Sequence, residues 1–312
     1  MKISFIGSGA VASNTAFMCG TNTICDEIVL LDINENYAKG KAIDLQQAFI
    51  LNSKKDILVV GTNNYSHVKG SDAIVITAGV ANKGNFNNRE ELLKMNKGII
   101  EQVATSLKSV ISTDEKQPLI IMVTNPLDII LKHFIDFGGF NKTKTIGSGN
   151  VLDTGRLQYY IAKELNVPFS QVETITVGQH GAKMVYLLSK TKVNGIEFFE
   201  YTKQHNISKE TIETICKNST AGSHEIISLL QKEGTIFGPA VSIYNLLNSY
   251  INNIEEVFPI SVYCNGEYGV KDVCVGCPTI LNGNGVKEVV EYHMTEEEQK
   301  DFANAVEFIR NF

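Results

Sequence analysis

The feature that most limits the fold is a regular alternation of apolar runs and helical stretches in the first half of the chain. The apolar runs are short and lack polar alternation, which is typical of parallel strands that are covered on both faces. We expect six strands of this kind, at residues 3–6, 28–31, 57–60, 73–77, 119–123 and near 145. Helical stretches lie between several of them, at residues 10–19, 37–49 and 90–109. Repeated strand–helix–strand units predict an α/β fold with a doubly wound parallel sheet.

The pattern changes after residue 147. A helix is expected at residues 151–165, and antiparallel-looking strands follow at 174–177, 183–188 and 192–193. Further helices are predicted at 209–218, 224–231, 239–248 and 294–309, and further strands at 256–263 and 273–280. Ser208 and Thr295 are the expected N-caps of two of these helices. We therefore predict two domains, a first at residues 1–147 and a mixed α+β domain at residues 148–312.

Charge and composition exclude several function classes. The formal net charge is −6 over 312 residues, so neither nucleic acid nor an acidic membrane surface is the expected partner. The chain opens on a strand and has no apolar run of membrane-spanning length, so we predict a cytoplasmic protein. Cys274 and Cys277 form a C-x-x-C pair, but no second pair has zinc-like spacing. We expect free thiols, a buried strand at this pair and no metal site.

A glycine-rich turn joins the first strand to the first helix. Gly7 permits the tight turn, Gly9 lets a pyrophosphate approach the backbone, and Ala12 keeps helix and strand close. Asp32 ends the next strand, about 20 residues on, where it can accept hydrogen bonds from both ribose hydroxyls and repel a 2′-phosphate. The alternative is a structural turn followed by a capping aspartate. The combination favours a Rossmann-type domain that binds NAD rather than NADP.

Polar residues occur where later strands and loops end. Asn125 follows a strand, His180 lies between glycines, Asp153 and Arg156 share one helix face, and Arg89 begins a helix. Each has a structural alternative, namely a turn cap, a solvated histidine, a surface ion pair or a solvated helix start. Together they predict a hydride-transfer site for a 2-hydroxy acid. Arg156 would bind the substrate carboxylate, and His180 would exchange the hydroxyl proton. Asp153 would orient the imidazole, and Arg89 would polarise the carbonyl when its loop closes.

With these residues in view, the chain resembles the lactate/malate dehydrogenase family over essentially its whole length. The matching motifs, in order, are "IGSGAVA", "LLDIN", "ITAG", "REELLKMN", "VTNPLDI", "IGSGNVLDTGRL", "GQHGA" and "NGEYGVKDV". The resemblance implies an NAD-dependent oxidoreductase that acts on a CH–OH group and forms a homodimer or homotetramer. It implies that His180, Asp153 and Arg89 are catalytic and that Arg156 and Asn125 bind a small 2-hydroxy or 2-oxo acid. It also implies cofactor contacts at Gly7, Gly9, Ala10, Val11, Asp32, Ala78, Gly79, Asn96, Val123 and Asn125.

The choice between lactate and malate turns on the loop after "ITAG". Malate enzymes usually have Pro-Arg-Lys-Pro there, and the arginine pairs with the second substrate carboxylate. Aligned from the left, Asn82 occupies the arginine position, whereas Lys83 occupies it when the longer loop is aligned from Arg89. Thr235 and "GSGNVLD" resemble the lactate enzymes, while "TNPLD", "REELLKMN" and "FGPAVS" resemble the malate enzymes. We predict an L-lactate dehydrogenase. The alternatives are a malate dehydrogenase, a dehydrogenase of another 2-hydroxy acid, and a non-catalytic NAD-binding sensor.

Four positions depart from the family pattern. Ala182 stands where the family usually has aspartate, and Gln179 replaces an acidic residue or glycine. Both adjoin His180, so they bear on the pKa of its imidazole and on the rate. Gln158 and Glu173 stand where many bacterial lactate enzymes have an arginine and a histidine that bind a sugar bisphosphate. We therefore predict no activation by fructose 1,6-bisphosphate.

Overall fold

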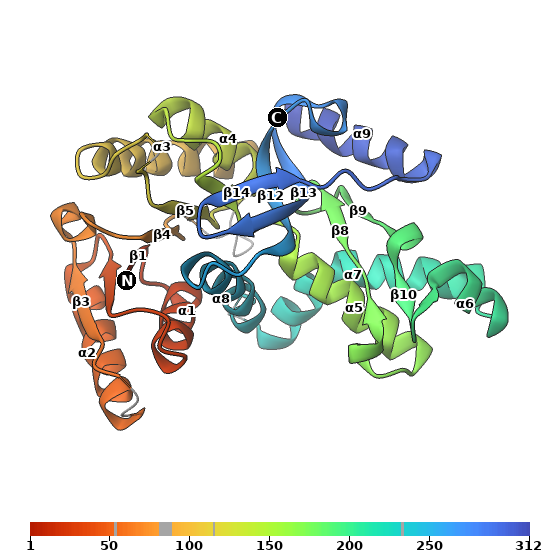
Figure 1. Cartoon of the computed structure of the whole chain (residues 1–312), viewed down its shortest axis with the longest axis horizontal. Helices are drawn as coiled ribbons and strands as arrows, with labels where there is room; N and C mark the ends of the chain where they lie inside the picture. The colour runs from red at the N-terminus through yellow and green to blue at the C-terminus, as the bar shows by residue number, and fades with distance from the viewer. Residues whose placement is uncertain (53–54, 81–88, 115, 232–233) are drawn as a thin grey trace.

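A large mixed sheet runs through the molecule. The computed structural model describes residues 1–52, 55–80, 89–114, 116–231 and 234–312. Within them, eleven strands form one sheet in the order β3-β2-β1-β4-β5-β6-β12-β13-β8-β9, with β14 paired to β13. A separate three-stranded sheet has the order β11-β10-β7. Figure 1 shows the first strands at one end of the molecule and the small sheet at the other.

The first half of the chain supplies the parallel part of the large sheet. All neighbouring strands here are parallel, which confirms the predicted doubly wound α/β fold. Because β1 has β2 on one side and β4 on the other, the chain changes direction across the sheet at β1. Such a switch point forms a crevice at the carboxyl ends of the strands, where ligands bind in this class of fold. The strands are β1 (Lys2–Ile6), β2 (Glu27–Leu31), β3 (Leu58–Thr62), β4 (Ala73–Ile76), β5 (Leu119–Met122) and β6 (Thr145–Gly147).

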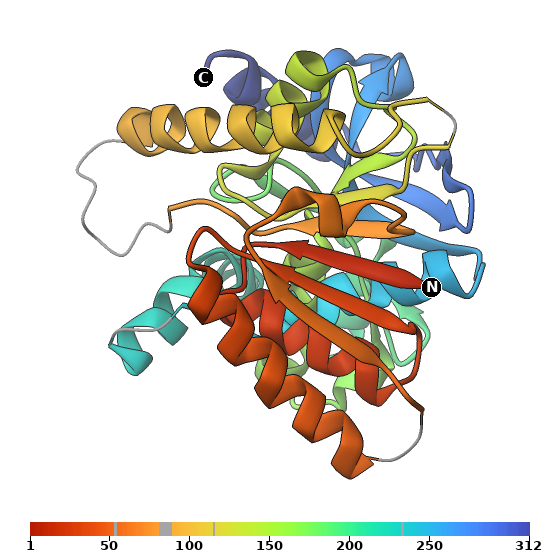
Figure 2. The ribbon, with the colours of Figure 1, turned by 90° about the vertical axis from the view of Figure 1, so that its left-hand side faces the viewer.

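Helices cover both faces of the parallel part. Figure 2 shows α3 along one face, with α1 and α2 along the other. Alternate strand residues serve the two faces, since Phe5 joins the core under α1 and α2 while Ile6 joins the core under α3 and α4. This double burial explains the continuous apolar runs of the sequence. The helices are α1 (Ala10–Thr21), α2 (Glu35–Asn52), α3 (Arg89–Lys108) and α4 (Leu127–Gly138).

The second half extends the same sheet with antiparallel strands. The junction is a single register pair, Ser261 of β12 opposite Gly147 of β6. A side chain on Gly147 would lie 2.9 Å from the Cβ of Ser261, so glycine allows this close approach. Strands predicted at 256–263 and 273–280 are confirmed. The added strands are β12 (Glu256–Asn265), β13 (Lys271–Asn282), β8 (Thr176–Gly178), β9 (Met184–Tyr186) and β14 (Gly285–Val289).

The remaining elements pack around these strands. The helices are α5 (Val151–Leu165), α6 (Phe198–Gln204), α7 (Lys209–Leu230), α8 (Phe237–Ile251) and α9 (Glu296–Arg310). The small sheet consists of β7 (Val172–Glu173), β10 (Lys192–Val193) and β11 (Ile196–Glu197). Single 3₁₀ turns occur at Tyr65–Val68, Phe169–Gln171, Leu188–Lys190 and Glu267–Gly269.

The prediction of two helices at 209–218 and 224–231 is wrong, because α7 is continuous through both. The small and polar residues between them do not break the helix. Gly222 lies against α5, where a Cβ would be 3.3 Å from the Tyr160 ring and 3.5 Å from the Arg156 side chain. Close packing therefore carries the helix through this weak stretch. Both predicted N-caps are confirmed: Ser208 accepts a hydrogen bond from a first-turn amide, and Thr295 forms a capping box with Glu298.

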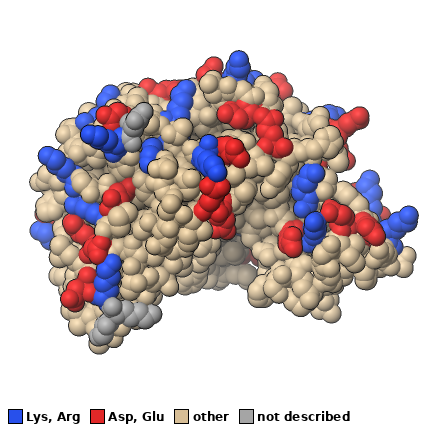
Figure 3. Space-filling model, viewed as in Figure 1, with Lys and Arg blue, Asp and Glu red and all other residues tan. Residues whose placement is uncertain are grey.

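Charged side chains of both signs are interspersed on the face shown in Figure 3, which is hollowed between two lobes at its lower edge. Among the helices of the described residues, none combines the length and apolar character needed to cross a bilayer. Cys274 and Cys277 are both buried in β13, as the sequence predicts, and both are free cysteines.

Candidate active site

The glycine-rich turn forms an open cradle at the start of α1. Gly7 has φ +97°, and a Cβ there would lie 2.7 Å from Thr77 Oγ1 and 2.9 Å from the Ala78 backbone nitrogen. Only glycine fits this position. Gly9 is the N-cap of α1, and apart from its chain neighbours no described atom lies within 4 Å of the place a Cβ would take there. The amides at Ala10 and Val11 begin the helix beside this space, so the turn fits a pyrophosphate.

Asp32 lies beside this cradle at the end of β2. Its Oδ2 accepts a hydrogen bond of 2.9 Å from the backbone amide of Ser8, and its Oδ1 accepts one of 3.0 Å from Asn34. These bonds fix the carboxylate next to the glycine-rich turn while each oxygen keeps acceptor capacity. The position fits the ribose of a dinucleotide, and its negative charge disfavours a 2′-phosphate.

The loops that follow β4 and β5 are joined by the fully buried Asn96 of α3. Its Nδ2 donates to the carbonyl oxygens of Val80 and Asn125, at 3.2 and 2.7 Å, and its Oδ1 accepts from the Val80 amide at 2.8 Å. Gly79 makes this packing possible, since a Cβ there would lie 2.5 Å from Thr124 Cγ2. We therefore place Asn96 as a residue that holds the two loops. The loops bring Ala78, Gly79, Val123 and the exposed Asn125 to the same edge of the sheet.

Three residues predicted for chemistry meet at one buried carboxylate. His180 Nδ1 lies 2.8 Å from Asp153 Oδ2, and Arg156 Nη1 donates to Asp153 Oδ1 at 3.0 Å. Asn150 Nδ2 approaches Oδ2 at 3.3 Å. The Asp153 side chain has no exposed surface, whereas the His180 and Arg156 side chains keep 19% and 13%. The alternatives of a solvated histidine and a surface ion pair are therefore wrong. Asp153 is buried, and two of its three partners, His180 and Arg156, still reach solvent.

This environment favours a charged imidazole. Burial lowers the pKa of His180, but the neighbouring Asp153 and Asp128 carboxylates outweigh burial and the Arg156 charge, so the pKa is raised overall. Because Nδ1 is bound to Asp153, Nε2 is the ring nitrogen that can exchange a proton with a ligand. The group can therefore act as an acid or a base near neutral pH.

Asp128 also contacts this cluster, although it is not among the residues predicted from the sequence. Its Oδ2 accepts the backbone amide of His180 at 2.8 Å, and its Oδ1 accepts the Ser261 hydroxyl at 2.7 Å. Burial raises its pKa to about 6. The sequence feature that could have indicated it is the carboxylate at the end of "VTNPLD", in the first turn of the helix that follows the strand. Asp128 also connects the two parts of the site, since the turn that carries Asn125 leads directly into its helix.

The sequence also predicts Asn82, Lys83, Arg89 and Thr235 as site residues. Asn82, Lys83 and the side chain of Arg89 lie outside the described residues. Thr235 is half-buried in the segment that precedes α8. Over the described residues, no three side chains of His, Cys, Asp or Glu are grouped as metal ligands would be.

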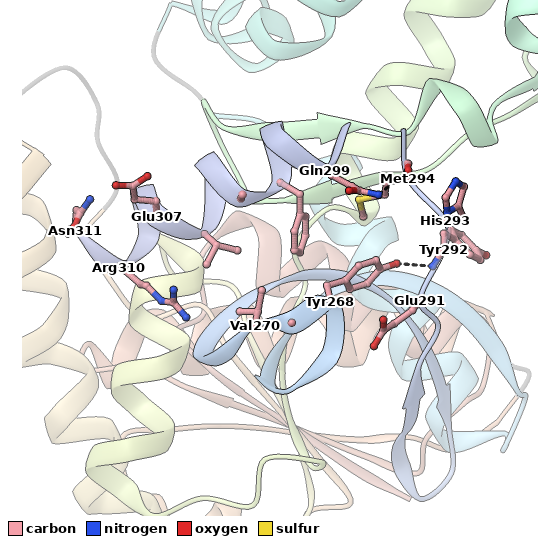
Figure 4. A pocket seen from close by; sticks show the side chains of 14 residues that line it. Tyr268, Val270, Glu291, Tyr292, His293, Met294, Gln299, Glu307, Arg310 and Asn311 are labelled. Carbon is pink, nitrogen blue, oxygen red and sulfur yellow. Dashed lines mark hydrogen bonds between the residues drawn. The ribbon is translucent and has the colours of Figure 1, made fainter. Parts of the chain in front are cut away.

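A hollow of about 930 Å³ lies elsewhere, between α9 and the turn that joins β12 to β13. Figure 4 shows its apolar floor, with Met294 and Val270, and its polar rim, with Glu291 and Arg310. It shares no lining residue with the His180 cluster or the glycine-rich turn. The hollow is therefore separate from the residues that the sequence predicts for catalysis and cofactor binding.

Comparisons with known proteins agree with this geometry. The family model for the lactate/malate dehydrogenase NAD binding domain matches residues 1–147, and the model for the alpha/beta C-terminal domain of the same family matches residues 150–311. Malate dehydrogenase of Pelagibacter ubique is 35% identical over 309 residues, which are 99% of this chain and 95% of that protein. The crystal structure of Cryptosporidium parvum malate dehydrogenase has a TM-score of 0.93 at 32% identity, covering 99% of this chain and 96% of that one. The same values hold for the lactate dehydrogenase of that organism, solved with lactic acid and nicotinamide adenine dinucleotide.

Proposed function

Because the chain belongs to the lactate/malate dehydrogenase family, and is thus an NAD-dependent oxidoreductase acting on CH–OH groups, we propose that it is an L-lactate dehydrogenase in which His180 is the acid/base. The observation that carries the site assignment is the buried Asp153 carboxylate, shared by His180 and Arg156. A carboxylate in this position orients the imidazole through Nδ1 and stabilises its protonated form. The same carboxylate fixes the guanidinium that is to bind the substrate.

Proton exchange takes place at His180. In the direction of oxidation, Nε2 of His180 accepts the proton of the substrate hydroxyl. A hydride leaves the carbon that carries this hydroxyl, and that carbon becomes the carbonyl carbon of a 2-oxo acid. Bound NAD supplies the hydride acceptor. In reduction, the imidazolium returns its proton to the carbonyl oxygen. The raised pKa of His180 favours the imidazolium that reduction requires.

Substrate is held by residues around this imidazole. Arg156 donates to Asp153 through one nitrogen, and its other N–H groups can bind the carboxylate of a 2-hydroxy acid. We assign Asn125 to the substrate and the nicotinamide from the family resemblance, and its loop leads into the helix that carries Asp128. We assign Arg89 to the carbonyl oxygen, from the family resemblance.

The choice of lactate rests on the loop before Arg89. Between Val80 and Arg89 the chain has one cation, Lys83, and no arginine to pair with a second substrate carboxylate. Lysine is a point charge without the planar fork that binds a carboxylate through two hydrogen bonds. Thr235, which resembles the lactate enzymes, also supports a substrate with one carboxylate.

Malate dehydrogenase is the second candidate, because the Pelagibacter ubique relative carries that name. In this case Lys83 or Asn82 would face the second carboxylate. A buried charge partner changes substrate preference by orders of magnitude, so one side chain can separate the two activities.

The deciding experiment follows NADH oxidation with pyruvate and with oxaloacetate and compares kcat/KM. We expect pyruvate to be preferred and Lys83→Ala to reduce both activities alike or neither. Preference for oxaloacetate, with a loss in Lys83→Ala confined to that substrate, would establish the malate alternative. NADH binding without turnover of either substrate would favour the sensor. His180→Gln is the inactive control.

The proposal also covers the two domains, the cellular location and the oligomeric state. Residues 1–147 would bind NAD, and residues 148–312 would supply the acid–base group. The protein would act in the cytoplasm as a homodimer or homotetramer. Exposed apolar side chains such as Ile43 of α2 and Phe237 of α8 support an oligomer. Sedimentation velocity of the purified chain tests this assignment, and a monomer at micromolar concentration would contradict it.

A further inference from the structure

Gln179 closes the short loop that presents His180. This loop runs from the end of β8 to the start of β9. Gln179 is buried, with 8% of the residue exposed, and both the oxygen and the nitrogen of its side-chain amide form hydrogen bonds within the loop. Its Nε2 donates to the His180 carbonyl oxygen at 2.6 Å, and its Oε1 accepts the Lys183 amide at 3.0 Å. The side chain thus spans the loop and joins its two sides.

Gly181 makes room for this amide. It has φ +142°, a conformation that side chains rarely permit, and a Cβ there would lie 2.8 Å from Gln179 Nε2. Ala182, which replaces the usual aspartate of the family, has no polar side chain with which to hold the loop. Among the described residues, the side-chain bonds within the loop therefore come from Gln179.

The main chain of His180 is held on both sides. Its amide donates to Asp128, and its carbonyl accepts from Gln179, while its ring is bound to Asp153. The ring bond fixes the distance to one carboxylate but still permits rotation and tilt of the residue. The two main-chain bonds remove that freedom. The direction of Nε2 follows from all three contacts together.

We propose that Gln179 is a positioning residue that sets the angle at which His180 presents Nε2 to the substrate. The inference rests on the proposed acid/base role of His180. It concerns kcat rather than cofactor binding, because Gln179 lies on the loop after β8 whereas the dinucleotide cradle lies after β1. Small misplacement of a reacting group costs rate steeply, up to about 100-fold for about 1 Å. Loss of the Gln179 bonds is therefore expected to lower kcat by roughly 10-fold to 100-fold.

The main test uses Gln179→Met, which keeps the length of the side chain but removes its donor and acceptor. The matched control is Gln46→Met. Gln46 of α2 has the same kind of bonds, donating to Ile57 O and accepting from the Val59 amide, both at 2.9 Å. We expect Gln179→Met to lose kcat with the KM for NADH unchanged within about twofold. Gln46→Met is expected to keep the wild-type kcat, even if its melting temperature falls by as much as that of Gln179→Met.

Gln179→Glu adds a readout that a purely structural role would not change. An ionised glutamate can accept from Lys183 but cannot donate to His180, whereas a protonated glutamate can do both. Asp128, Asp153 and Arg156 surround the imidazole equally in all variants. We therefore expect the ratio of Gln179→Glu to wild-type kcat to rise as pH falls, while the ratio for Gln179→Met stays flat.

Wild-type kcat in Gln179→Met, or an equal loss in Gln46→Met, would overturn the proposal. If Gln179→Met does not fold, the test is the ratio of the Gln179→Glu kcat to the wild-type kcat as pH falls. A ratio that does not change with pH would overturn the positioning role of Gln179. An inactive wild type would instead defeat the proposed function. In that case the positioning role of Gln179 is tested by NMR titration of the His180 ring. A midpoint and line width in Gln179→Glu equal to those of the wild type would overturn it.

Discussion

His180 and Asp153 are 27 positions apart in the chain, and yet the Nδ1 of the imidazole lies 2.8 Å from an oxygen of the carboxylate. The first residue follows β8 and the second lies in the first turn of α5. A bond from the Thr176 amide to the Thr154 hydroxyl, at 3.0 Å, ties the same two elements together beside this contact. The packing of the strand against the helix therefore brings these two side chains within hydrogen-bond distance.

Asp153→Asn should lower kcat by roughly 100-fold or more. The amide is similar in shape but carries no charge to stabilise the imidazolium, and it can present an N–H to Nδ1 and reverse the ring tautomer. Affinity for NADH, measured by fluorescence titration, should stay within about twofold. Asp44→Asn on the exposed face of α2 is the matched control. Near-normal kcat in Asp153→Asn would remove Asp153 from the mechanism.

The pH dependence follows from the raised pKa of His180. Reduction requires the imidazolium, so its kcat/KM should be greatest below that pKa and fall as pH rises through it. Oxidation requires the neutral ring, so its kcat/KM should rise over the same range. Asp128→Asn removes a carboxylate that raises this pKa and should move both midpoints to lower pH. Midpoints that stay in place in Asp128→Asn would show that its charge does not act on the imidazole.

Much of the fold could be predicted because double burial leaves a strong trace in the sequence. The runs that became β1, β2 and β4 are apolar on both faces and have one interpretation. The stretch around Gly222 has low helix propensity, and its sequence does not indicate a helix. Its helical state is decided by contact with Tyr160 and Arg156, which no local pattern reports.

The site was predictable where chemistry requires a particular side chain in a particular motif. Asp128 was missed because it acts through the His180 backbone amide, 52 positions away, and an amide has no signature in a sequence. Gln179 stood out only as a departure from the family. Its two hydrogen bonds depend on the positive φ of Gly181, which the sequence does not state.

Arg156→Lys should raise the KM for pyruvate by roughly 10-fold to 100-fold. The guanidinium can bind Asp153 and still offer a two-pronged face to the substrate, whereas an ammonium offers a point charge. The KM for NADH should not change. Arg310→Lys is the control, since Arg310 binds the Lys271 carbonyl oxygen far from the site and should leave both constants unaltered. A normal KM for pyruvate in Arg156→Lys would exclude this carboxylate-binding role.

Asp32→Asn should shift the cofactor preference toward NADPH. The substitution keeps an oxygen that can accept from the Ser8 amide but removes the negative charge that opposes a 2′-phosphate. We expect the ratio of kcat/KM for NADH over NADPH to fall by about 10-fold to 100-fold, which corresponds to one or two charged hydrogen bonds. The ratio is measured at fixed pyruvate. An unchanged ratio would mean that Asp32 does not face the ribose.

Fructose 1,6-bisphosphate should not increase the rate. Gln158 is neutral, and its Nε2 already donates to the carbonyl oxygens of Phe169 and Val172, at 2.9 and 3.0 Å. The exposed Glu173, which stands at the second matched position, adds a negative charge that opposes a bisphosphate. Initial rates at subsaturating pyruvate should therefore be equal with the bisphosphate and with an equal ionic strength of inorganic phosphate. A saturable rise with the bisphosphate alone would contradict this, and its loss in a variant of Gln158 would then place an effector site at these residues.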